Sequence, residues 1–191
     1  LTICTKKLRS LQFDPISGII KADCGVMLPN LSNYLAKNGL QGGEWTIGIP
    51  GTIGGAIFMN AGSGNFSISQ NLLSVKAIDN KTLKIINFKK DDLIFKYRYS
   101  QFQKSNLMVI SAKFMFEPNG NPKIINEKTK ANLKKKTDTQ PYHLPSFGSV
   151  FKNPKGLYAA KLIEEAGLKG LKHGGAQISN MHSNFIVNAS N

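Results

Sequence analysis

The chain has 191 residues, of which 41% are hydrophobic, and carries 25 Lys and Arg against 11 Asp and Glu, for a net charge of +14. This length suffices for one large or two small domains with a buried core. No apolar run approaches the roughly 20 residues of a membrane helix, the first ten residues lack a signal-peptide pattern, and Cys4 and Cys24 lack metal-binding or CxxC spacing. We therefore expect a cytoplasmic protein with no membrane partner and no metal.

The positive charge has two readings. It can mark a polyanionic partner such as nucleic acid, or a solvated basic surface. The lysines are scattered, no nucleic-acid-binding motif accompanies them, and the densest run, Lys128 to Lys136, is typical of an exposed helix face. We therefore favour the solvated surface and predict no nucleic-acid partner.

The first part of the chain reads as short strands, a helix and a hairpin. Strands are predicted at residues 11–13 and 18–24, around a turn at Asp14-Pro15. Pro29 suits the first turn of a helix in which Leu31, Tyr34 and Leu35 recur at helical spacing and which Gly39 ends. Residues 72–78 and 82–88 are predicted to form a hairpin, and 107–116 another strand.

The later part begins with the turn-rich stretch 118–122, PNGNP, which is the candidate domain boundary. A basic helix is predicted at about 123–136, and the segment 141–154 has three prolines and no helical pattern. An amphipathic helix follows at 157–166, with Leu162 and Ile163 inward and Gly167 as its cap, before a strand at 185–187. Strands followed by mixed helices indicate an α+β class.

The stretch at 48–62, GIPGTIGGAIFMNAG, has five glycines, one proline and no charge. It matches neither GxGxxG nor the P-loop pattern. Pro50-Gly51 suits the centre of a type II turn, and the Thr52 hydroxyl can cap a short helix. The small residues Gly54, Gly55 and Ala56 would let a flat or anionic ligand reach backbone N–H groups. From spacing alone, a ligand site and a tight turn packed under a sheet both remain open.

Several motifs, in order, resemble the UDP-N-acetylenolpyruvoylglucosamine reductases (MurB) of bacterial cell-wall synthesis. The stretch at 48–62 resembles their flavin-binding segment, preceded by a GLxGxE-like lead-in at 39–45. Residues 95–102, FKYRYSQF, resemble FxYRxSxF, and residues 148–154, GSVFKNP, resemble GSxFKNP. Residues 162–170, 174–179 and 182–188 resemble the end of the family's substrate domain. The resemblance covers nearly the whole chain.

The resemblance implies a fold and a reaction. The fold would be an FAD-binding domain of the vanillyl-alcohol-oxidase/PCMH type at 1–118, followed by a MurB-type α+β substrate-binding domain at 119–191. The protein would use FAD and NADPH to reduce UDP-N-acetylglucosamine enolpyruvate to UDP-N-acetylmuramate for peptidoglycan, as a monomer. Two alternatives remain: a flavoprotein oxidase of the same FAD fold, and an inactive basic binding remnant.

The resemblance also implies roles for individual residues. Arg98 matches the catalytic arginine and Ser149 the proton donor, although without the motifs an ion-pair arginine and a turn serine would be the ordinary interpretations. Substrate-binding residues would be Tyr97, Lys152, Asn153 and Asn184. Cofactor-binding residues would be Gly48, Ile49, Pro50, Gly51, Thr52, Ile53, Gly54, Gly55, Asn60, Ala61 and Gly62.

The resemblance further implies that the chain corresponds to a part of the family's sequence. The family's glycine-serine-asparagine phosphate loop would fall before residue 1, and its catalytic glutamate after Asn191. Glu164 and Glu165 lie on the predicted amphipathic helix and do not match that glutamate.

Overall fold

The computed structural model describes residues 3–190. The chain divides into two compact units, Leu1–Asn132 and Leu133–Asn191. Each unit has its own antiparallel sheet. The division falls inside α3 (Pro122–Thr139), a single helix of 18 residues and about 27 Å. The basic helix is therefore confirmed, and most of its lysines are exposed as expected. The predicted boundary at 118/119 stays a prediction.

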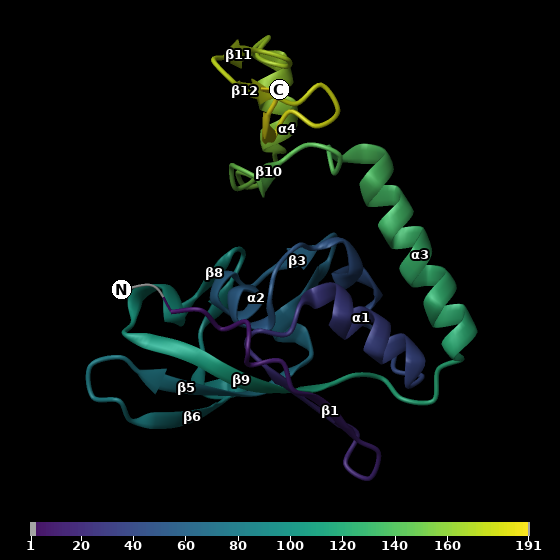
Figure 1. The fold of residues 1–191 in the computed structure, drawn as a ribbon, viewed down its shortest axis with the longest axis vertical. Coiled ribbons are helices and arrows are strands. Elements are labelled where there is room, and N and C mark those ends of the chain that lie inside the picture. Colours follow the sequence, from purple (N-terminus) through teal and green to yellow (C-terminus); the bar gives the residue numbers. More distant parts are fainter. Residues whose placement is uncertain (1–2, 191) are drawn as a thin grey trace. The chain divides into compact units, whose positions relative to one another are not determined.

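The first unit is built on a five-stranded sheet in the order β1-β2-β9-β5-β6 (Figure 1). Its strands are β1 (Leu11–Asp14), β2 (Ile19–Asp23), β5 (Leu72–Asp79), β6 (Ile85–Lys89) and β9 (Leu107–Met115). Each of these strands was predicted from its apolar pattern, and the β5–β6 hairpin is confirmed. All neighbouring strands are antiparallel.

Two helices cover one face of this sheet, α1 (Leu28–Lys37) and α2 (Ile53–Met59) (Figure 1). The core lies between these helices and the sheet. Alternate residues of β2, β9 and β5 point into it, such as Ile20, Phe114 and Val75. Leu31 of α1 and Ile57 of α2 belong to the same core cluster. Pro29 lies in the first turn of α1, and Gly39 follows it with φ of +67°, as predicted.

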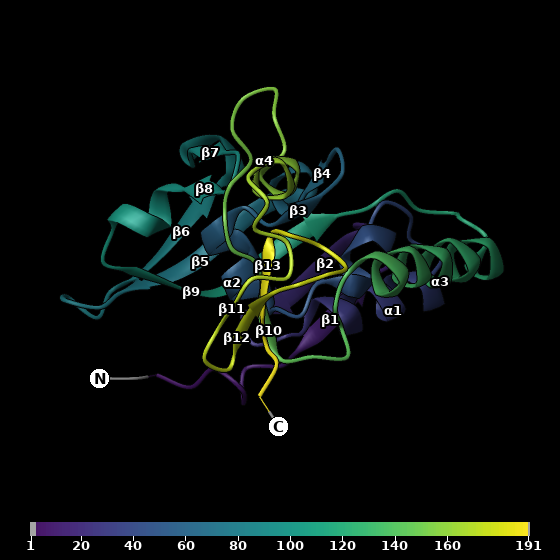
Figure 2. The ribbon, with the colours of Figure 1, turned by 90° about the horizontal axis from the view of Figure 1, so that it is seen from above.

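Short elements complete the first unit. Four 3-10 helices span Glu44–Gly48 (η1), Ile68–Gln70 (η2), Lys90–Asp92 (η3) and Gln101–Lys104 (η4). Two small hairpins are formed by β3 (Gly62–Ser63) with β4 (Phe66–Ser67), and by β7 (Phe95–Lys96) with β8 (Tyr99–Ser100). The second hairpin contacts α2 through β8, and the views in Figures 1 and 2 both place β8 beside this helix.

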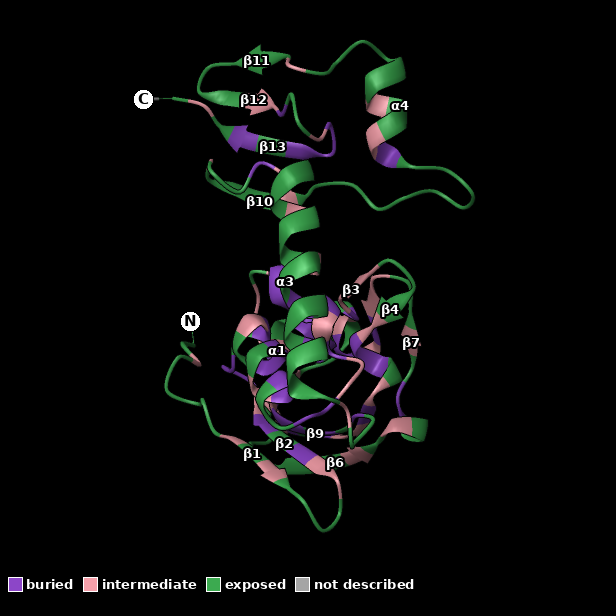
Figure 3. Cartoon of the chain, turned by 90° about the vertical axis from the view of Figure 1, so that its right-hand side faces the viewer, coloured by how far each residue is buried: buried purple, intermediate pink, exposed green. Residues whose placement is uncertain are grey.

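The second unit has a four-stranded sheet in the order β10-β13-β12-β11. Its strands are β10 (Ser146–Ser149), β11 (Lys172–His173), β12 (Ala176–Ile178) and β13 (Phe185–Asn188), and its short helix is α4 (Ala159–Glu165). The strand at β13 and the helix α4 were predicted, and Gly167 ends α4 with φ of +71°. Figure 3 shows that β13 is the most buried strand of this sheet.

One prediction for the second unit is wrong, and one strand was not predicted. The segment 141–154 has no helix, as expected, but it contains β10, which pairs with β13 through a bulge at Gly148, where φ is +78°. Its prolines did not prevent pairing, because all lie outside the paired residues. Leu162 is 39% exposed instead of inward, because the buried side of α4 is centred on Ala159 and Ile163, at i,i+4 spacing.

Candidate functional site

The glycine-rich segment surrounds α2. Thr52 is the N-cap of this helix, and its hydroxyl accepts a hydrogen bond from the N–H of Gly55 at 3.3 Å, as predicted. The type II turn predicted at Pro50-Gly51 is wrong, because Gly51 does not have positive φ. Instead the Gly51 N–H donates to the Ile49 carbonyl, which forms a γ-turn centred on Pro50. The following residue, Thr52, is extended and forms a β-bridge with Met27.

The N-terminal end of α2 borders a cavity of about 290 Å³ in the first unit. This volume is at the lower end for ligand pockets, so it holds only a part of a dinucleotide. Gly55 opens onto the cavity, since a Cβ there would meet only Thr52 Oγ1, at 3.7 Å. The cavity lining is Thr5, Cys24, Thr52, Gly54, Gly55, Phe58, Leu107, Met108 and Val109.

Gly54 differs from Gly55 although both line the cavity. A Cβ at Gly54 would lie 3.0 Å from Cys24 Cβ and 3.2 Å from Cys24 O, and the Gly54 N–H donates to that carbonyl at 2.8 Å. Gly54 is therefore small because α2 packs closely on the end of β2. Burial also raises the pKa of the Cys24 thiol, which favours its neutral form.

The other predicted cofactor residues are divided between surface and core. Gly51 has open space where a Cβ would point, and Pro50 is exposed. Gly48 is buried, while Ile49, Ala61 and Gly62 are half-buried. Ile53 is fully buried and its N–H donates to Val26, so the structure favours a packing role over the predicted cofactor contact.

Arg98 lies in the two-residue turn between β7 and β8, and its φ is +51°. This left-handed conformation is unfavourable for a residue with a Cβ, by about 1–2 kcal/mol. The guanidinium is half-buried: its Nη2 donates to Gly62 O at 2.8 Å, and its Cζ lies 5.0 Å from the centre of the Tyr97 ring. The structure thus brings three predicted residues together, Arg98, Tyr97 and Gly62.

Asn60 connects this turn to α2. It caps the C-terminus of α2 with φ of +43°, and its Nδ2 donates to Lys96 O at 2.9 Å. Its side chain is buried, and its Oδ1 has no partner among residues 3–190. Asn60 therefore acts on the hairpin that carries Arg98, and the cofactor contact predicted for it stays a prediction.

The second predicted group lies in the second unit, on and after β10. Ser149 ends this strand next to the Gly148 bulge and is exposed, and its hydroxyl has no hydrogen-bond partner within the described part of the chain. The Lys152 side chain is exposed. Asn153 Oδ1 accepts from the Ala159 N–H at 3.0 Å, at the start of α4. Ser149, Lys152 and Asn153 thus follow one another along a single exposed loop.

Asn184 holds this loop to the sheet. Its amide pairs with both backbone groups of Phe151, accepting from N–H at 2.9 Å and donating to the carbonyl at 2.8 Å. Its own carbonyl accepts from Val150 N–H at 2.9 Å. Asn184 is buried and is engaged by the loop that follows Ser149, so the structure favours a positioning role over the predicted substrate contact.

A charged cluster beside Asn184 was not predicted as functional. Glu164 accepts hydrogen bonds from Lys169 and Ser183, both at 2.9 Å, and these bonds lower its pKa. His182 Nδ1 accepts from the Asn184 N–H at 3.3 Å, and burial lowers its pKa. These contacts indicate a structural role for His182.

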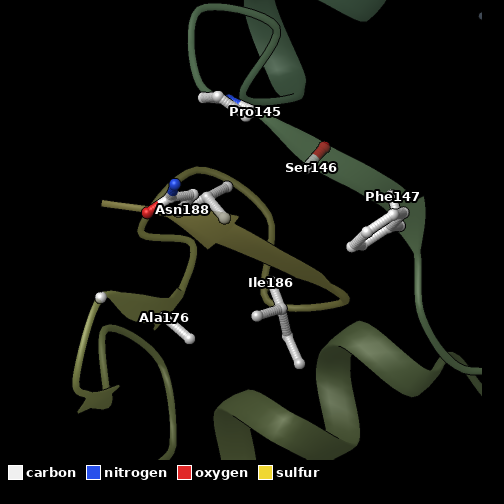
Figure 4. A pocket seen from close by; sticks show the side chains of 8 residues that line it. Pro145, Ser146, Phe147, Ala176, Ile186 and Asn188 are labelled. Atoms are coloured by element: carbon white, nitrogen blue, oxygen red, sulfur yellow. The ribbon is translucent and has the colours of Figure 1, made fainter. Parts of the chain in front are cut away.

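A separate cavity of about 430 Å³ lies in the second unit (Figure 4). It contains none of the predicted site residues; Figure 4 shows Phe147 and Ile186 at its edge. Its lining is Pro145, Ser146, Phe147, Gly175, Ala176, Ile186, Val187 and Asn188.

Within residues 3–190, no group of three or more His, Cys, Asp or Glu side chains is placed to hold a metal ion. No helix in this range combines the length and apolar character needed to cross a bilayer.

Comparison with known proteins covers both units. A family model described as "FAD binding domain" matches residues 1–87, and one described as "UDP-N-acetylenolpyruvoylglucosamine reductase, C-terminal domain" matches residues 140–191. These matches confirm the predicted order of an FAD-binding fold followed by a MurB-type α+β domain.

Individual relatives agree. The chain is 66% identical over 190 residues to the UDP-N-acetylenolpyruvoylglucosamine reductase of Prochlorococcus marinus subsp. pastoris, covering 100% of this chain and 64% of that protein. It is 44% identical over 191 residues to that of a Synechococcus species, covering 100% and 63%. The crystal structure of the enzyme (MurB) from Thermus caldophilus matches with a TM-score of 0.81 at 33% identity, over 90% of this chain and 62% of that one. The chain therefore belongs to the UDP-N-acetylenolpyruvoylglucosamine reductase family and spans a little under two thirds of the length of these relatives.

Proposed function

We propose that the protein is an FAD-dependent reductase that converts UDP-N-acetylglucosamine enolpyruvate to UDP-N-acetylmuramate with NADPH, in peptidoglycan synthesis. The observation that carries this proposal is the arrangement around α2. A glycine-lined cavity lies at one end of this helix, and the hairpin that presents Arg98 is fixed to the other end. The proposal agrees with the names of the relatives.

The residues at the N-terminal end of α2 fit a flavin cofactor. Gly51 and Gly55 leave space where a side chain would stand, and the cavity beside Gly55 is mostly apolar in its lining. We propose that Thr52, Gly54 and Gly55 hold FAD directly, while the buried Gly48 and Ile53 shape the segment. When bound, the flavin supplies the hydride that reduces the substrate's double bond.

Arg98 is the group we propose for the negative charge of the substrate. A guanidinium remains charged at any physiological pH and can bind a carboxylate through two parallel hydrogen bonds. As hydride reaches one carbon of the enolpyruvyl group, charge develops over the neighbouring carbon and the carboxylate. A fixed cation stabilises that charge more than it stabilises the ground state.

Ser149 is the group we propose as proton donor to the neighbouring carbon. Its exposed hydroxyl is unpaired among residues 3–190, so its donor is free to face a ligand. A serine hydroxyl is a weak acid, so it requires neighbours that stabilise the alkoxide or relay its proton. The exposed ammonium of Lys152 is one positive charge on the same loop.

The remaining substrate contacts follow from exposure. We propose that Lys152 binds phosphate oxygens of the UDP group as a point charge, and that Tyr97, 54% exposed, contacts the substrate beside Arg98. Asn153, whose Oδ1 accepts from the Ala159 N–H, is proposed to contact the substrate from the same exposed loop as Lys152.

The proposal extends to partners and place. The net charge of +14 suits two polyanionic ligands, the UDP-sugar and NADPH. We propose a cytoplasmic monomer, without a nucleic-acid or membrane partner, whose product serves the cell wall and thereby cell shape and division.

The visible spectrum of the purified full-length protein tests the cofactor, and its consumption of NADPH tests the reaction. We expect a yellow protein that oxidises NADPH when UDP-N-acetylglucosamine enolpyruvate is added. Oxygen consumption with another substrate, and none with this one, would indicate a flavoprotein oxidase instead. A colourless protein that gains no flavin on incubation with FAD would contradict the proposal.

A further inference from the structure

The turn at Arg98 needs support from outside the hairpin. Two-residue turns with a residue at positive φ normally use glycine or asparagine there. An arginine in this conformation persists only where its surroundings determine the backbone. The sequence of the turn, Tyr97-Arg98, contributes no such residue, so contacts from other elements must hold it.

Gln103 provides a contact of this kind. It lies on η4, directly after the hairpin, and its side-chain Nε2 is 2.9 Å from Phe58 O and 3.3 Å from Arg98 O. One amide group therefore joins the last turn of α2 to the peptide of Arg98. Phe58 O also needs donors, because carbonyls at a helix end lack partners within the helix.

Two other side chains attach the same hairpin but not its turn. Ser100 Oγ donates to Phe58 O at 2.7 Å, and Asn60 Nδ2 donates to Lys96 O at 2.9 Å. These bonds fix the strands β7 and β8 against α2. Among the described residues, Gln103 is the side chain that donates to the carbonyl of Arg98 itself.

We infer that Gln103 is a positioning residue for Arg98: its amide fixes the left-handed turn from which the guanidinium reaches Gly62 O and the substrate. This inference rests on the proposed function of Arg98. Gln103 acts here as a donor, because both of its oxygen partners are backbone carbonyls that can only accept.

Three substitutions of Gln103 test whether the residue acts as a hydrogen-bond donor. Gln103→Glu keeps the shape but replaces the donor by an oxygen that faces two carbonyl oxygens, and Gln103→Leu removes the donor without adding charge. Gln103→Lys keeps donors on a chain of similar reach. The matched control is Gln101→Glu on the same 3-10 helix, because Gln101 Oε1 accepts from Ile94 N–H at 2.9 Å, and a carboxylate still accepts there.

The first measurement is the backbone conformation at residue 98 by NMR, from its HN–Hα coupling and the intraresidue NOE. It requires no cofactor. We expect positive φ in the parent, Gln101→Glu and Gln103→Lys, and loss of positive φ in Gln103→Glu and Gln103→Leu. Positive φ retained in both of the last two variants would overturn the inference.

The second measurement is the reoxidation of reduced flavin by saturating enolpyruvyl substrate in the full-length protein. We expect Gln103→Glu and Gln103→Leu to slow this step about tenfold or more, because small misplacements of a charged group are costly. Flavin content and flavin reduction by NADPH should match the parent, and Gln103→Lys should largely restore the rate. Reoxidation at the parent rate in Gln103→Leu would overturn the inference. A parent protein whose flavin is never reoxidised by this substrate would instead refute the proposed function. In that case the NMR measurement alone tests whether Gln103 fixes the turn at Arg98.

Discussion

Ser149 carries the sharpest prediction at the scale of single residues. Its hydroxyl is exposed at the end of β10 and is proposed to protonate the substrate. Ser149→Ala should slow reoxidation of the flavin by the enolpyruvyl substrate by about a hundredfold or more, as expected for a lost acid. Reduction of the flavin by NADPH should be unchanged, because that step does not need this proton.

Anaerobic single-turnover spectroscopy measures both steps. Ser146→Ala is the matched control, because this serine lies at the other end of β10 and its Oγ accepts from Gly148 N–H. Ser149→Cys asks whether another donor of similar size can substitute. Reoxidation at the parent rate in Ser149→Ala would make Ser149 a turn residue.

Arg98→Lys keeps the positive charge but removes the planar fork of donors. We expect substrate reduction to slow by about a hundredfold, the effect of losing one donor that stabilises developing charge. Flavin reduction by NADPH should change little. Stopped-flow traces of the two half-reactions measure this, and equal damage to both would point to a structural role.

From the buried imidazole of His182 we predict that the stability of the protein depends on pH. Burial holds its pKa below the ordinary value of about 6.5, so the unfolded state binds the proton more readily than the folded state. Stability should therefore fall as pH drops below about 6.5, and level off below the folded-state pKa. Protonation would also remove the acceptor for the Asn184 N–H.

Urea unfolding of the parent at several pH values, followed by a probe in the second unit, tests this. His182→Gln should weaken the dependence, whereas His173→Gln should leave it intact, since His173 is exposed. A parent whose stability rises between pH 7 and pH 5.5 would contradict the account.

The motifs named Arg98 and Ser149, but they did not reveal how these residues are held. The positive φ of Arg98 depends on a hydrogen bond from Gln103 of η4, and on the attachment of the hairpin to α2, which is distant in sequence. Ser100 lies within the motif at 95–102 and Gln103 directly follows it, so the sequence marked this region without assigning either residue a role. The engagement of Asn184 with Phe151 spans 33 positions and has no local signal.

At the scale of elements, the packing of α2 on β2 separates two glycines that look alike in sequence. Gly54→Val should destabilise the fold by about 1–3 kcal/mol, because its side chain would collide with Cys24. Gly55→Val should leave stability nearly unchanged, since its Cβ has space, but should lower flavin content by filling the proposed cofactor site.

Thermal unfolding and the ratio of flavin to protein absorbance measure the two effects. Only the Gly54 substitution is expected to lower the unfolding temperature. Gly55→Val with full flavin occupancy would contradict the assignment of this segment to the cofactor.

Elements with a strong local pattern were predictable. The helix α1 has a proline in its first turn and a left-handed glycine after its end, and the β5–β6 hairpin has alternating apolar residues. In contrast, β10 depends on its partner β13 and on a bulge at Gly148, so its pattern is not that of a regular strand. Leu162 was misplaced because α4, with seven residues, is too short to define its buried side.

At the scale of the whole molecule, the order of the motifs was more informative than any single one. The glycine segment alone left a ligand site and a packed turn equally open, and in the structure Gly54 packs on β2 while Gly55 opens to a cavity. Arg98 and Ser149 belong to different compact units.

The central claim is that the protein binds FAD and uses it to reduce an enolpyruvyl ether. The most direct test is anaerobic: full-length protein loaded with FAD is reduced by NADPH and then mixed with UDP-N-acetylglucosamine enolpyruvate, while the flavin absorbance is followed. The account predicts that the flavin is reoxidised in a single turnover and that one equivalent of UDP-N-acetylmuramate forms. Flavin that stays reduced in the presence of this substrate would contradict it.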